Sequence, residues 1–324
     1  VTSDAGKIAA LRSRLPAGIE AAAGDQALLD LVTRPDVDIV LCAIVGTGGL
    51  LPVLAALRAG KRVALASKEV MVMAGELVNR VRSEHPAAEL IPVDSEHSAL
   101  FQCLAGRHGN EVEKLILTAS GGAFRDADDE TIRNANAADA LRHPTWSMGP
   151  KVTVDSASLM NKALELIEAR HLFNFDPDRL DVLIHPESVV HSLISLADGA
   201  MIAQMSMPDM RFAIQYALSY PERFDGALPK FDFARMPGLH FREVDHRRFP
   251  AIGFARRAMA AGGTLPAVMN AANEVAVESF LQGRIAFPEI WSIIEKTMER
   301  HQVVPQSSLE EIFEADRWSR SFAA

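Results

Sequence analysis

The sequence predicts an α/β fold in three parts, and three observations lead to this prediction. Short apolar segments alternate with helix-like segments between residues 38 and 93. The middle of the chain mixes strand-like and helix-like segments without that alternation, and after Pro250 the pattern is helical. Alternating strands and helices are typical of a doubly wound parallel sheet. We therefore expect a parallel-sheet domain, an α+β domain and a small C-terminal helical bundle.

The first part alternates three strand-like and two helix-like segments, which are residues 38–43, 50–59, 62–66, 71–81 and 90–93. The first strand ends close to Gly46, Gly48 and Gly49. An apolar run followed by glycines predicts a buried parallel strand followed by a turn. Gly60 follows the first helix as a C-cap. This order is that of the second half of a dinucleotide-binding domain, so residues 1–93 are expected to form part of a Rossmann-like domain.

The remaining chain divides into three predicted regions. The middle domain, residues 94–219, contains expected strands at 115–118, 152–154, 189–196 and 201–205 and an expected helix at 158–170. Asp198-Gly199 lies between the last two strands and predicts a hairpin. Residues 220–249 are rich in proline, glycine and charge and are interpreted as a linker. Helical periodicity over residues 250–324 predicts the terminal bundle.

Composition limits the classes of function. The 324 residues are 48% hydrophobic and 23% charged, which is ordinary for a soluble globular protein. A formal net charge of -9 argues against general nucleic-acid binding, although a local site for a small anion stays open. Two cysteines, Cys42 and Cys103, suit a reducing compartment. No apolar run reaches the roughly 18 residues that span a membrane.

The acidic motif Asp94-Ser95-Glu96 follows the third strand. In extended chain, residues two apart point the same way, so Asp94 and Glu96 are expected to offer oxygens to one point. Hard oxygen ligands suit Mg²⁺ or Mn²⁺. The alternative is a strand end with two solvated acids, which is the more common arrangement for such a motif alone.

A second group, Asn161, Lys162 and Glu165, shares one face of the expected helix because its members are three and four residues apart. Asn161 and Lys162 could hold a phosphate while Glu165 supplies a third metal oxygen. The alternative is an ordinary Lys–Glu surface pair. Ser156 and Ser158 lie just upstream, and hydroxyl groups near a helix N-terminus suit an anion.

Three loops are further candidates for contacts with a ligand. Small residues at 119–122, including Ser120, let backbone N–H groups approach a ligand, or they form a plain turn. The segment 143–150 carries Trp146 and Met148 and suggests a lid, or a loop pinned to the core by its Trp. Residues 67–69 stand at the carboxyl end of a parallel strand, where such sheets bind ligands, or they start a solvated helix.

The histidines His97, His185 and His191 are also candidate contacts, although a single histidine is more often structural. Six motifs taken together carry more weight than any one of them. In chain order they are IPVDSEHSALFQCL, LTASGGAFRD, HPTWSMGPKVTVDSASLMNKALELIEARHLF, IHPESVVHS, MPDMR and NAANEVAV. With these motifs the sequence from about Ile39 to its end resembles the 1-deoxy-D-xylulose 5-phosphate reductoisomerase family.

The resemblance implies a reaction and a substrate that spacing alone does not give. Enzymes of that family rearrange the ketose phosphate to an aldehyde, which NADPH reduces to 2-C-methyl-D-erythritol 4-phosphate for isoprenoid synthesis. The cofactors implied are NADPH and Mn²⁺ or Mg²⁺. The partner implied is a small phosphorylated ketose, without nucleic acid or membrane. The resemblance, together with two apolar strands in the middle domain, also leads us to expect a homodimer.

Residue roles follow from the resemblance motif by motif. The implied metal ligands are Asp94, Glu96 and Glu165. The substrate's hydroxylated end would meet Lys68 and Ser95, and its phosphate would meet Ser120, Ser156, Asn161 and Lys162, with His143 nearby. Trp146 and Met148 would belong to the flap. NADPH would lie along Ala43, Ser67, Glu69, Gly149 and the 207–210 segment with Met210. The implied catalytic residues are Lys68, Glu96, Glu165 and His143.

Two departures from the family pattern change these expectations. Ser67 replaces the usual Asn before the Lys-Glu pair, and we expect a small effect. The glycine-rich turn G-x-T-G-S-I-G and the segment after it, which reads the 2′-phosphate, are absent, so we expect an N-terminally truncated chain. The full-length protein should be the enzyme, whereas this chain should bind NADPH poorly or not at all, which leaves its own activity open. A bacterial cytoplasmic location is expected, with a plastid left open.

Two other functions stay open at this point. A metal-dependent sugar-phosphate isomerase or aldolase without a redox step explains the acids but not the α/β region before Val93. A non-catalytic relative explains the fold, but not why the three acids and Lys68 are all kept.

Overall fold

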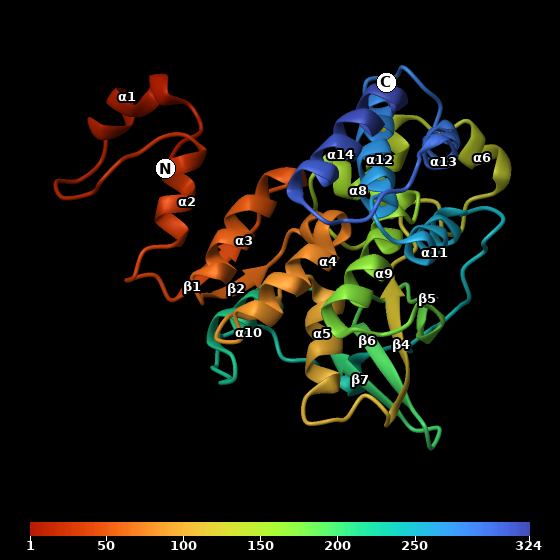
Figure 1. Cartoon of the computed structure of the whole chain (residues 1–324). Coiled ribbons are helices and arrows are strands. Elements are labelled where there is room, and N and C mark those ends of the chain that lie inside the picture. The colour runs from red at the N-terminus through yellow and green to blue at the C-terminus, as the bar shows by residue number, and fades with distance from the viewer.

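The computed structural model describes residues 1–324 and contains two separate sheets (Figure 1). The first sheet is parallel, with strands in the order β1 (Ile39–Cys42), β2 (Arg62–Leu65) and β3 (Glu89–Pro92). Its crossovers are α3 (Leu50–Arg58), preceded by the 3₁₀ turn η2 (Gly46–Gly49), and α4 (Lys68–Glu84). This is the predicted alternation, and the α/β fold class is confirmed.

Helix α4 carries a kink that lets it approach α9 (Met160–Phe173) closely. Ala74 has non-helical backbone angles, and the next residue, Gly75, faces the ring of His171. A Cβ atom at Gly75 would lie 2.3 Å from that ring, so only glycine fits there. The first turn of α4, which begins at Lys68, therefore belongs to a helix that packs against α9.

The second sheet has four strands in the order β5-β4-β6-β7. They are β4 (Val112–Ala119), β5 (Leu180–Ile184), β6 (Val190–Leu196) and β7 (Met201–Met205). Strands β4 and β5 are parallel, whereas β6 and β7 are antiparallel neighbours. Their hairpin turns at Asp198-Gly199, where Gly199 has a φ of 86°, as predicted. Strand β5 was not predicted.

The expected strand at residues 152–154 is wrong. These residues belong to α8 (Pro150–Ala157), which begins with Pro150 at its first turn. Proline is favourable there because its missing N–H would be unsatisfied in any case. The β-branched Thr153 and Val154 are buried on the inner side of this helix, so packing overrides their local preference for a strand.

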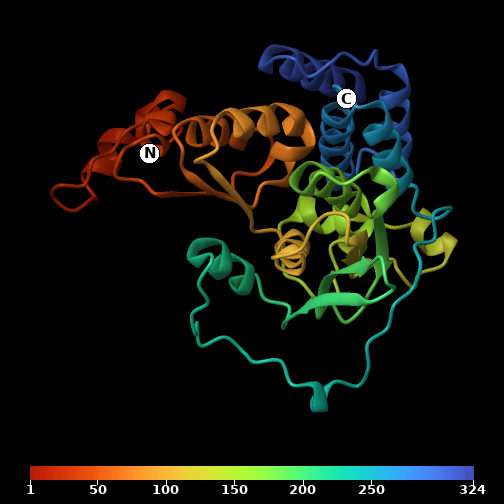
Figure 2. The same cartoon turned by 60° about the horizontal axis from the view of Figure 1, so that its bottom comes forward.

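Short helices connect these elements. They are α5 (Ser95–Leu104), α6 (Asp129–Arg133), α7 (Ala137–Ala140), η3 (Pro177–Arg179) and α10 (Arg211–Ser219). Residues 220–249 contain one 3₁₀ turn, η4 (Phe233–Arg235), and run as a long excursion between α10 and the next helix (Figure 2). The boundaries of the predicted domains remain predictions.

The C-terminal region is helical, as predicted. Its helices are α11 (Ala251–Ala261), α12 (Leu265–Leu281), α13 (Glu289–Arg300) and α14 (Leu309–Ala323). Helix α12 packs against α13, α14 and α4, and α11 packs against α9. The largest hydrophobic cluster therefore runs from the second sheet through α9 into this bundle.

The first residues form η1 (Ala5–Lys7), α1 (Ile8–Arg12) and α2 (Asp25–Val32), and α2 packs against α3. Both views show them at the far side of the parallel sheet from the helical bundle (Figures 1 and 2). None of the helices combines the length and the apolar character needed to cross a membrane.

Candidate active site and metal centre

One cavity of about 270 Å³ collects most of the residues that the sequence analysis singled out. It is lined by parts of α4, α5, α8 and α9, the end of β4, the start of β6 and the loop before α8. The predicted metal and substrate residues around it are Lys68, Asp94, Ser95, Glu96, Ser120, His143, Trp146, Ser156, Asn161, Lys162 and Glu165. Met148, His191 and Met210 also line it.

The backbone expected for the acidic motif is wrong. Strand β3 ends at Pro92, Asp94 is the N-cap of α5, and Glu96 lies in the first helical turn rather than in extended chain. Its side chain accepts a hydrogen bond from the backbone N–H of Glu96 at 3.3 Å. Aspartate ahead of a helical segment is a strong N-cap because its oxygen satisfies a free N–H group. The first helical turn, not strand alternation, brings Asp94 and Glu96 together.

The carboxylates of Asp94, Glu96 and Glu165 converge. One oxygen from each lies within 4.8 Å of the others. Glu165 comes from α9 and is 1% exposed. Three oxygens of this kind fit a divalent cation such as Mg²⁺ or Mn²⁺, which prefers hard oxygen ligands.

Two lysines compensate the three carboxylates. Lys68 Nζ lies 2.7 Å from Asp94 Oδ2 and 2.9 Å from Glu165 Oε1. Lys162 Nζ lies 3.0 Å from Glu96 Oε1 and also contacts Glu165. Because buried charges need partners, these pairs allow the acids to stay close together away from water.

The buried charges change the acidity of the cluster. Burial and the negative charge of Glu165 raise the pKa of Glu96 to about 7, although Lys162 opposes the rise. Burial alone would raise the pKa of Asp94, but Lys68 and His97 outweigh it and hold that pKa well below its usual range. Burial lowers the pKa of Lys162, but Glu165 and Glu96 raise it overall. Of Asp94 and Glu96, Glu96 is thus the carboxylate that is more easily protonated near neutral pH.

Polar groups suited to an anion lie on the other side of the cavity. His143 Nε2 is 2.9 Å from Ser120 Oγ and 3.1 Å from Ser156 Oγ. Its Nδ1 accepts backbone N–H bonds from Thr145 at 3.1 Å and Trp146 at 2.8 Å. Because Nδ1 accepts, the proton of a neutral ring sits on Nε2. Burial, with Arg125 nearby, lowers the pKa of His143 and favours this neutral form.

Gly122 explains why Ser120 and Ser156 can share one histidine. Gly122 has a φ of 66°, and a Cβ atom there would lie 2.4 Å from the carbonyl oxygen of Ser156. The glycine therefore lets the loop after β4 lie directly against α8.

Asn161 and Lys162 face the acidic cluster in this structure. Asn161 Oδ1 accepts a hydrogen bond from Lys68 Nζ at 2.8 Å, and its Nδ2 donates to Glu165. An amide nitrogen carries two N–H donors and an ammonium three. Asn161 and Lys162 each therefore keep one donor beyond these contacts, and both line the cavity.

The residues expected along NADPH are placed differently. Met210 lines the cavity, whereas Ala43, Ser67, Glu69 and Gly149 do not. Ala43 follows β1, and Ser67 follows β2 and donates its hydroxyl hydrogen to the Ile44 carbonyl at 2.6 Å. Glu69 lies 3.4 Å from Lys151 Nζ, and Gly149 caps α8. Ala43, Ser67 and Glu69 thus follow the carboxyl ends of β1 and β2 and do not line the cavity that holds the acidic cluster.

The other candidates separate into cavity and structural residues. His191 lines the cavity, and its Nε2 is 2.8 Å from Ser206 Oγ. His185 accepts backbone N–H bonds from Val189 and Val190 through Nε2, so it is structural. Ser158 is fully buried and does not line the cavity.

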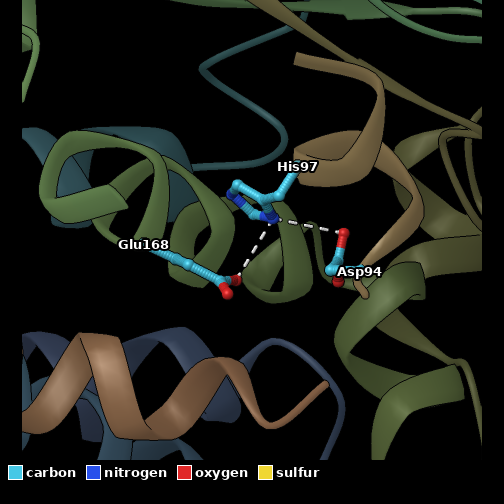
Figure 3. Close-up of side chains that lie close together, drawn as sticks. All are labelled: Asp94, His97 and Glu168. Carbon is cyan, nitrogen blue, oxygen red and sulfur yellow. Dashed lines mark ion pairs between the residues drawn. The ribbon is translucent and has the colours of Figure 1, made fainter. Parts of the chain in front are cut away.

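Sequence reasoning missed Glu168, which lies behind the acidic cluster. Its carboxylate is 3.2 Å from His97 Nδ1, and that nitrogen is 3.3 Å from Asp94 Oδ1 (Figure 3). Glu168 follows Glu165 by three residues in α9, so the two share a helix face. The spacing of three residues from Glu165 was the sequence signal that could have identified Glu168.

The family models match most of the chain. The model described as "1-deoxy-D-xylulose 5-phosphate reductoisomerase" matches residues 1–75, and its C-terminal domain model matches residues 90–173. The model "DXP reductoisomerase C-terminal domain" matches residues 205–322. A reductoisomerase from Pelotomaculum thermopropionicum is 52% identical over 92% of this chain and 77% of its own length. This chain belongs to the 1-deoxy-D-xylulose 5-phosphate reductoisomerase family.

Relatives and solved structures of the reductoisomerase family agree with that assignment. A reductoisomerase from Chlorobium chlorochromatii is 52% identical over 89% of this chain and 75% of its own length. A Zymomonas mobilis reductoisomerase, solved in complex with NADPH, superposes with a TM-score of 0.93 at 41% identity, over 99% of this chain and 83% of that one. Another, in complex with NADPH, fosmidomycin and magnesium, gives 0.93 at 38% identity, over 99% and 84%.

Proposed function

We propose that this chain converts 1-deoxy-D-xylulose 5-phosphate to 2-C-methyl-D-erythritol 4-phosphate with NADPH and a divalent metal. The observation that carries the proposal is the single cavity in which three convergent carboxylates face a Ser–His–Ser anion group. The similarity to reductoisomerases solved with NADPH, magnesium and fosmidomycin supports the choice of substrate and cofactors.

Asp94, Glu96 and Glu165 are the residues that we propose to hold the metal. Bound there, a divalent cation supplies a Lewis acid and a template for two neighbouring substrate oxygens. Lys68 lies within 3 Å of two of these acids, so it is placed to meet a substrate hydroxyl at the same point. Ser95 donates its hydroxyl hydrogen to Glu96 Oε2 at 2.6 Å and orients that carboxylate.

The anion group is proposed to hold the substrate phosphate. Ser120, Ser156 and the Nε2–H of His143 offer donors from one side, and the free donors of Asn161 and Lys162 offer them from the other. Binding energy from a phosphate remote from the reacting carbons can be used for orientation. Trp146 and Met148 line the same cavity and are proposed to exclude water when the loop closes.

The nicotinamide cofactor is proposed to approach from the parallel sheet. Ala43, Ser67 and Glu69 border the carboxyl ends of β1 and β2, where open α/β sheets bind ligands. Gly149 and Met210 would meet the cofactor's nicotinamide end, since Met210 lines the cavity and Gly149 begins the helix that carries Ser156. We also propose the domain division expected from the sequence, with boundaries after residues 93, 219 and 249.

The chain is also proposed to form a homodimer in the cytoplasm of a bacterium. Strand β7 is the edge of the four-stranded sheet, and its outer side has no partner strand in one copy. An open edge is a template for pairing with a second strand. Light scattering at micromolar concentration should give twice the chain mass of 35.2 kDa; a monomeric mass would contradict the dimer.

The reaction is tested with 1-deoxy-D-xylulose 5-phosphate, NADPH and Mn²⁺ together. NADPH loss is followed by absorbance, and the phosphorylated product by phosphorus NMR. One NADPH should be oxidised for each product formed, and EDTA should stop both changes. Isomerised or cleaved sugar phosphate without NADPH loss would instead support an isomerase or aldolase. Metal-dependent substrate binding with no product, in a chain that also binds NADPH, would support a non-catalytic relative.

A further inference from the structure

A buried ionic chain runs behind the metal cluster and ends at Glu168. The ring of His97 stands between Glu168 and Asp94, with its Nδ1 atom 3.2 Å from Glu168 Oε2 and 3.3 Å from Asp94 Oδ1 (Figure 3). Neither His97 nor Glu168 lines the cavity, and both are 0% exposed. They cannot contact substrate, so any role in the reaction must pass through their neighbours.

The same ring also reaches a second proposed metal ligand. His97 Nε2 is 2.9 Å from the main-chain carbonyl oxygen of Glu165. A carbonyl oxygen only accepts hydrogen bonds, so Nε2 must carry a hydrogen atom. His97 therefore connects the side chain of one proposed ligand, Asp94 at the start of α5, to the backbone of another, Glu165 in α9.

The other ring nitrogen faces two acids at once. His97 Nδ1 lies against Glu168 Oε2 on one side and Asp94 Oδ1 on the other, and it makes a hydrogen bond to neither. Both oxygens of Glu168 also lack a hydrogen-bond partner, and His97 is the group that this carboxylate faces as an ion-pair partner. Because a buried carboxylate is costly unless it is paired, the contact with His97 is what offsets the burial of Glu168.

We propose that Glu168 is a positioning residue that acts through His97 to hold Asp94 and Glu165 in the arrangement that binds the metal. The proposal rests on the metal site of the proposed function. Glu168 stands against the His97 ring from behind, and the ring in turn contacts Asp94 and the Glu165 carbonyl. Loss of the Glu168 charge weakens its contact with the ring, so the ring can turn away from Asp94 or from the Glu165 carbonyl, and one metal ligand is released from its position. Groups that orient metal ligands typically change metal affinity by 10- to 100-fold when removed.

The test uses Mn²⁺ alone, because metal binding can be measured without substrate, cofactor or turnover. Free Mn²⁺ is titrated by electron paramagnetic resonance against the wild-type chain, Glu168→Gln, His97→Gln and the double variant. Glu168→Gln should weaken Mn²⁺ binding by about tenfold or more. Because Glu168 acts through His97, the double variant should bind within about twofold of His97→Gln. One Mn²⁺ per chain should bind in the wild type.

Asp155→Asn is the matched control. Asp155 is 1% exposed and also lies in a buried ion pair, 2.8 Å from Lys151 Nζ, but it does not line the cavity. The Asp155→Asn variant should be less stable than the wild type but should bind Mn²⁺ with the same affinity. If Glu168→Gln does not fold, Glu168→Asp, which keeps the charge on a shorter arm, should show an intermediate loss of Mn²⁺ affinity.

Several outcomes would overturn the inference. Wild-type Mn²⁺ affinity in Glu168→Gln would show that the charge behind His97 has no such role, while the proposed metal site would stand. Two Mn²⁺ ions in the wild type and one in Glu168→Gln would make Glu168 a metal ligand instead. Losses that multiply in the double variant would mean that Glu168 acts independently of His97. A wild-type chain that binds no Mn²⁺ would contradict the metal site itself and this inference with it.

Discussion

Lys68 Nζ lies 2.9 Å from Glu165 Oε1, although 97 positions separate the two residues in the chain. Lys68 begins the helix that follows the second parallel strand, and Glu165 lies in the middle of α9. This contact joins the carboxyl end of the central strand β2 of the parallel sheet to the acidic cluster. It also means that an ammonium group stabilises the carboxylates where the metal is proposed to bind.

Lys68→Met should therefore make the stability of the fold depend on the metal. Loss of the lysine leaves Asp94 and Glu165 without one of their buried partners, and breaking such a pair costs about 3 to 5 kcal/mol. In EDTA the free energy of unfolding by urea should fall by roughly that amount, and Mn²⁺ should restore much of it. The exposed Lys296→Met in α13 is the control and should change little. Equal stability of Lys68→Met and wild type in EDTA would contradict the role of Lys68.

The sequence predicted features that depend on local spacing. Strand and helix alternation before residue 93 was readable because apolar runs and glycines lie close together in the chain. The shared face of Asn161, Lys162 and Glu165 followed from helical spacing in the same way. The assignment of metal and substrate roles, by contrast, came from family motifs.

Features that depend on distant contacts were not predicted. The three β-branched residues at 152–154 fit a strand locally, but packing within α8 decides their conformation. Asp94 was expected in extended chain, because its capping role depends on where α5 begins. Glu168 has no visible partner in the sequence, since His97 lies on another helix and 71 positions away.

Gly75→Ala should destabilise the fold through the packing of α4 on α9. The added Cβ atom would meet the His171 ring at 2.3 Å, and the atoms that it meets are not the flexible end of a side chain. Overpacking of this kind typically costs about 1 to 3 kcal/mol. Urea unfolding should show that loss, and adding His171→Ala should remove the clash. Gly253→Ala in α11, where nothing lies within 4 Å, should be neutral or stabilising. Stability of Gly75→Ala equal to wild type would show that the helices can separate at no cost.

His191 should make the fold less stable in mild acid. Burial lowers its pKa from the ordinary 6.5 to about 4 in the folded chain. Between these values the unfolded chain binds more protons, so stability is fully present above about pH 6.5 and is lost as the pH falls towards 4. The contribution lost between pH 7 and pH 5 is about 2 kcal/mol.

His191→Gln should reduce the difference in unfolding free energy between pH 7 and pH 5 by that amount. The exposed His246→Gln should leave the difference unchanged. The same pH dependence in His191→Gln and wild type would mean that other groups cause the acid destabilisation.

Trp146 should report closure of the loop over a bound ligand. It lines the cavity, and its backbone N–H is held by His143, which also contacts Ser120 and Ser156. A phosphonate-hydroxamate of the fosmidomycin type, added with Mn²⁺, should change tryptophan fluorescence and protect residues 143–149 from proteolysis.

Trp146→Phe separates this signal from that of the other two tryptophans. Trp291 is buried and donates its indole N–H to the Ser158 carbonyl at 3.1 Å, and Trp318 stacks on Phe322. If the ligand changes the fluorescence of Trp146→Phe as much as that of wild type, or leaves the loop equally cleavable, Trp146 anchors the loop and does not close it.

The acidic cluster and the anion group are proposed to form one ligand site that depends on a metal. Isothermal titration of the same phosphonate-hydroxamate into the chain tests it most directly, because its two hydroxamate oxygens require the metal and its phosphonate requires the anion group. The ligand should bind with Mn²⁺ present, and its affinity should fall by about tenfold or more in EDTA or in Glu165→Gln. Equal affinity with Mn²⁺, in EDTA and in Glu165→Gln would contradict it.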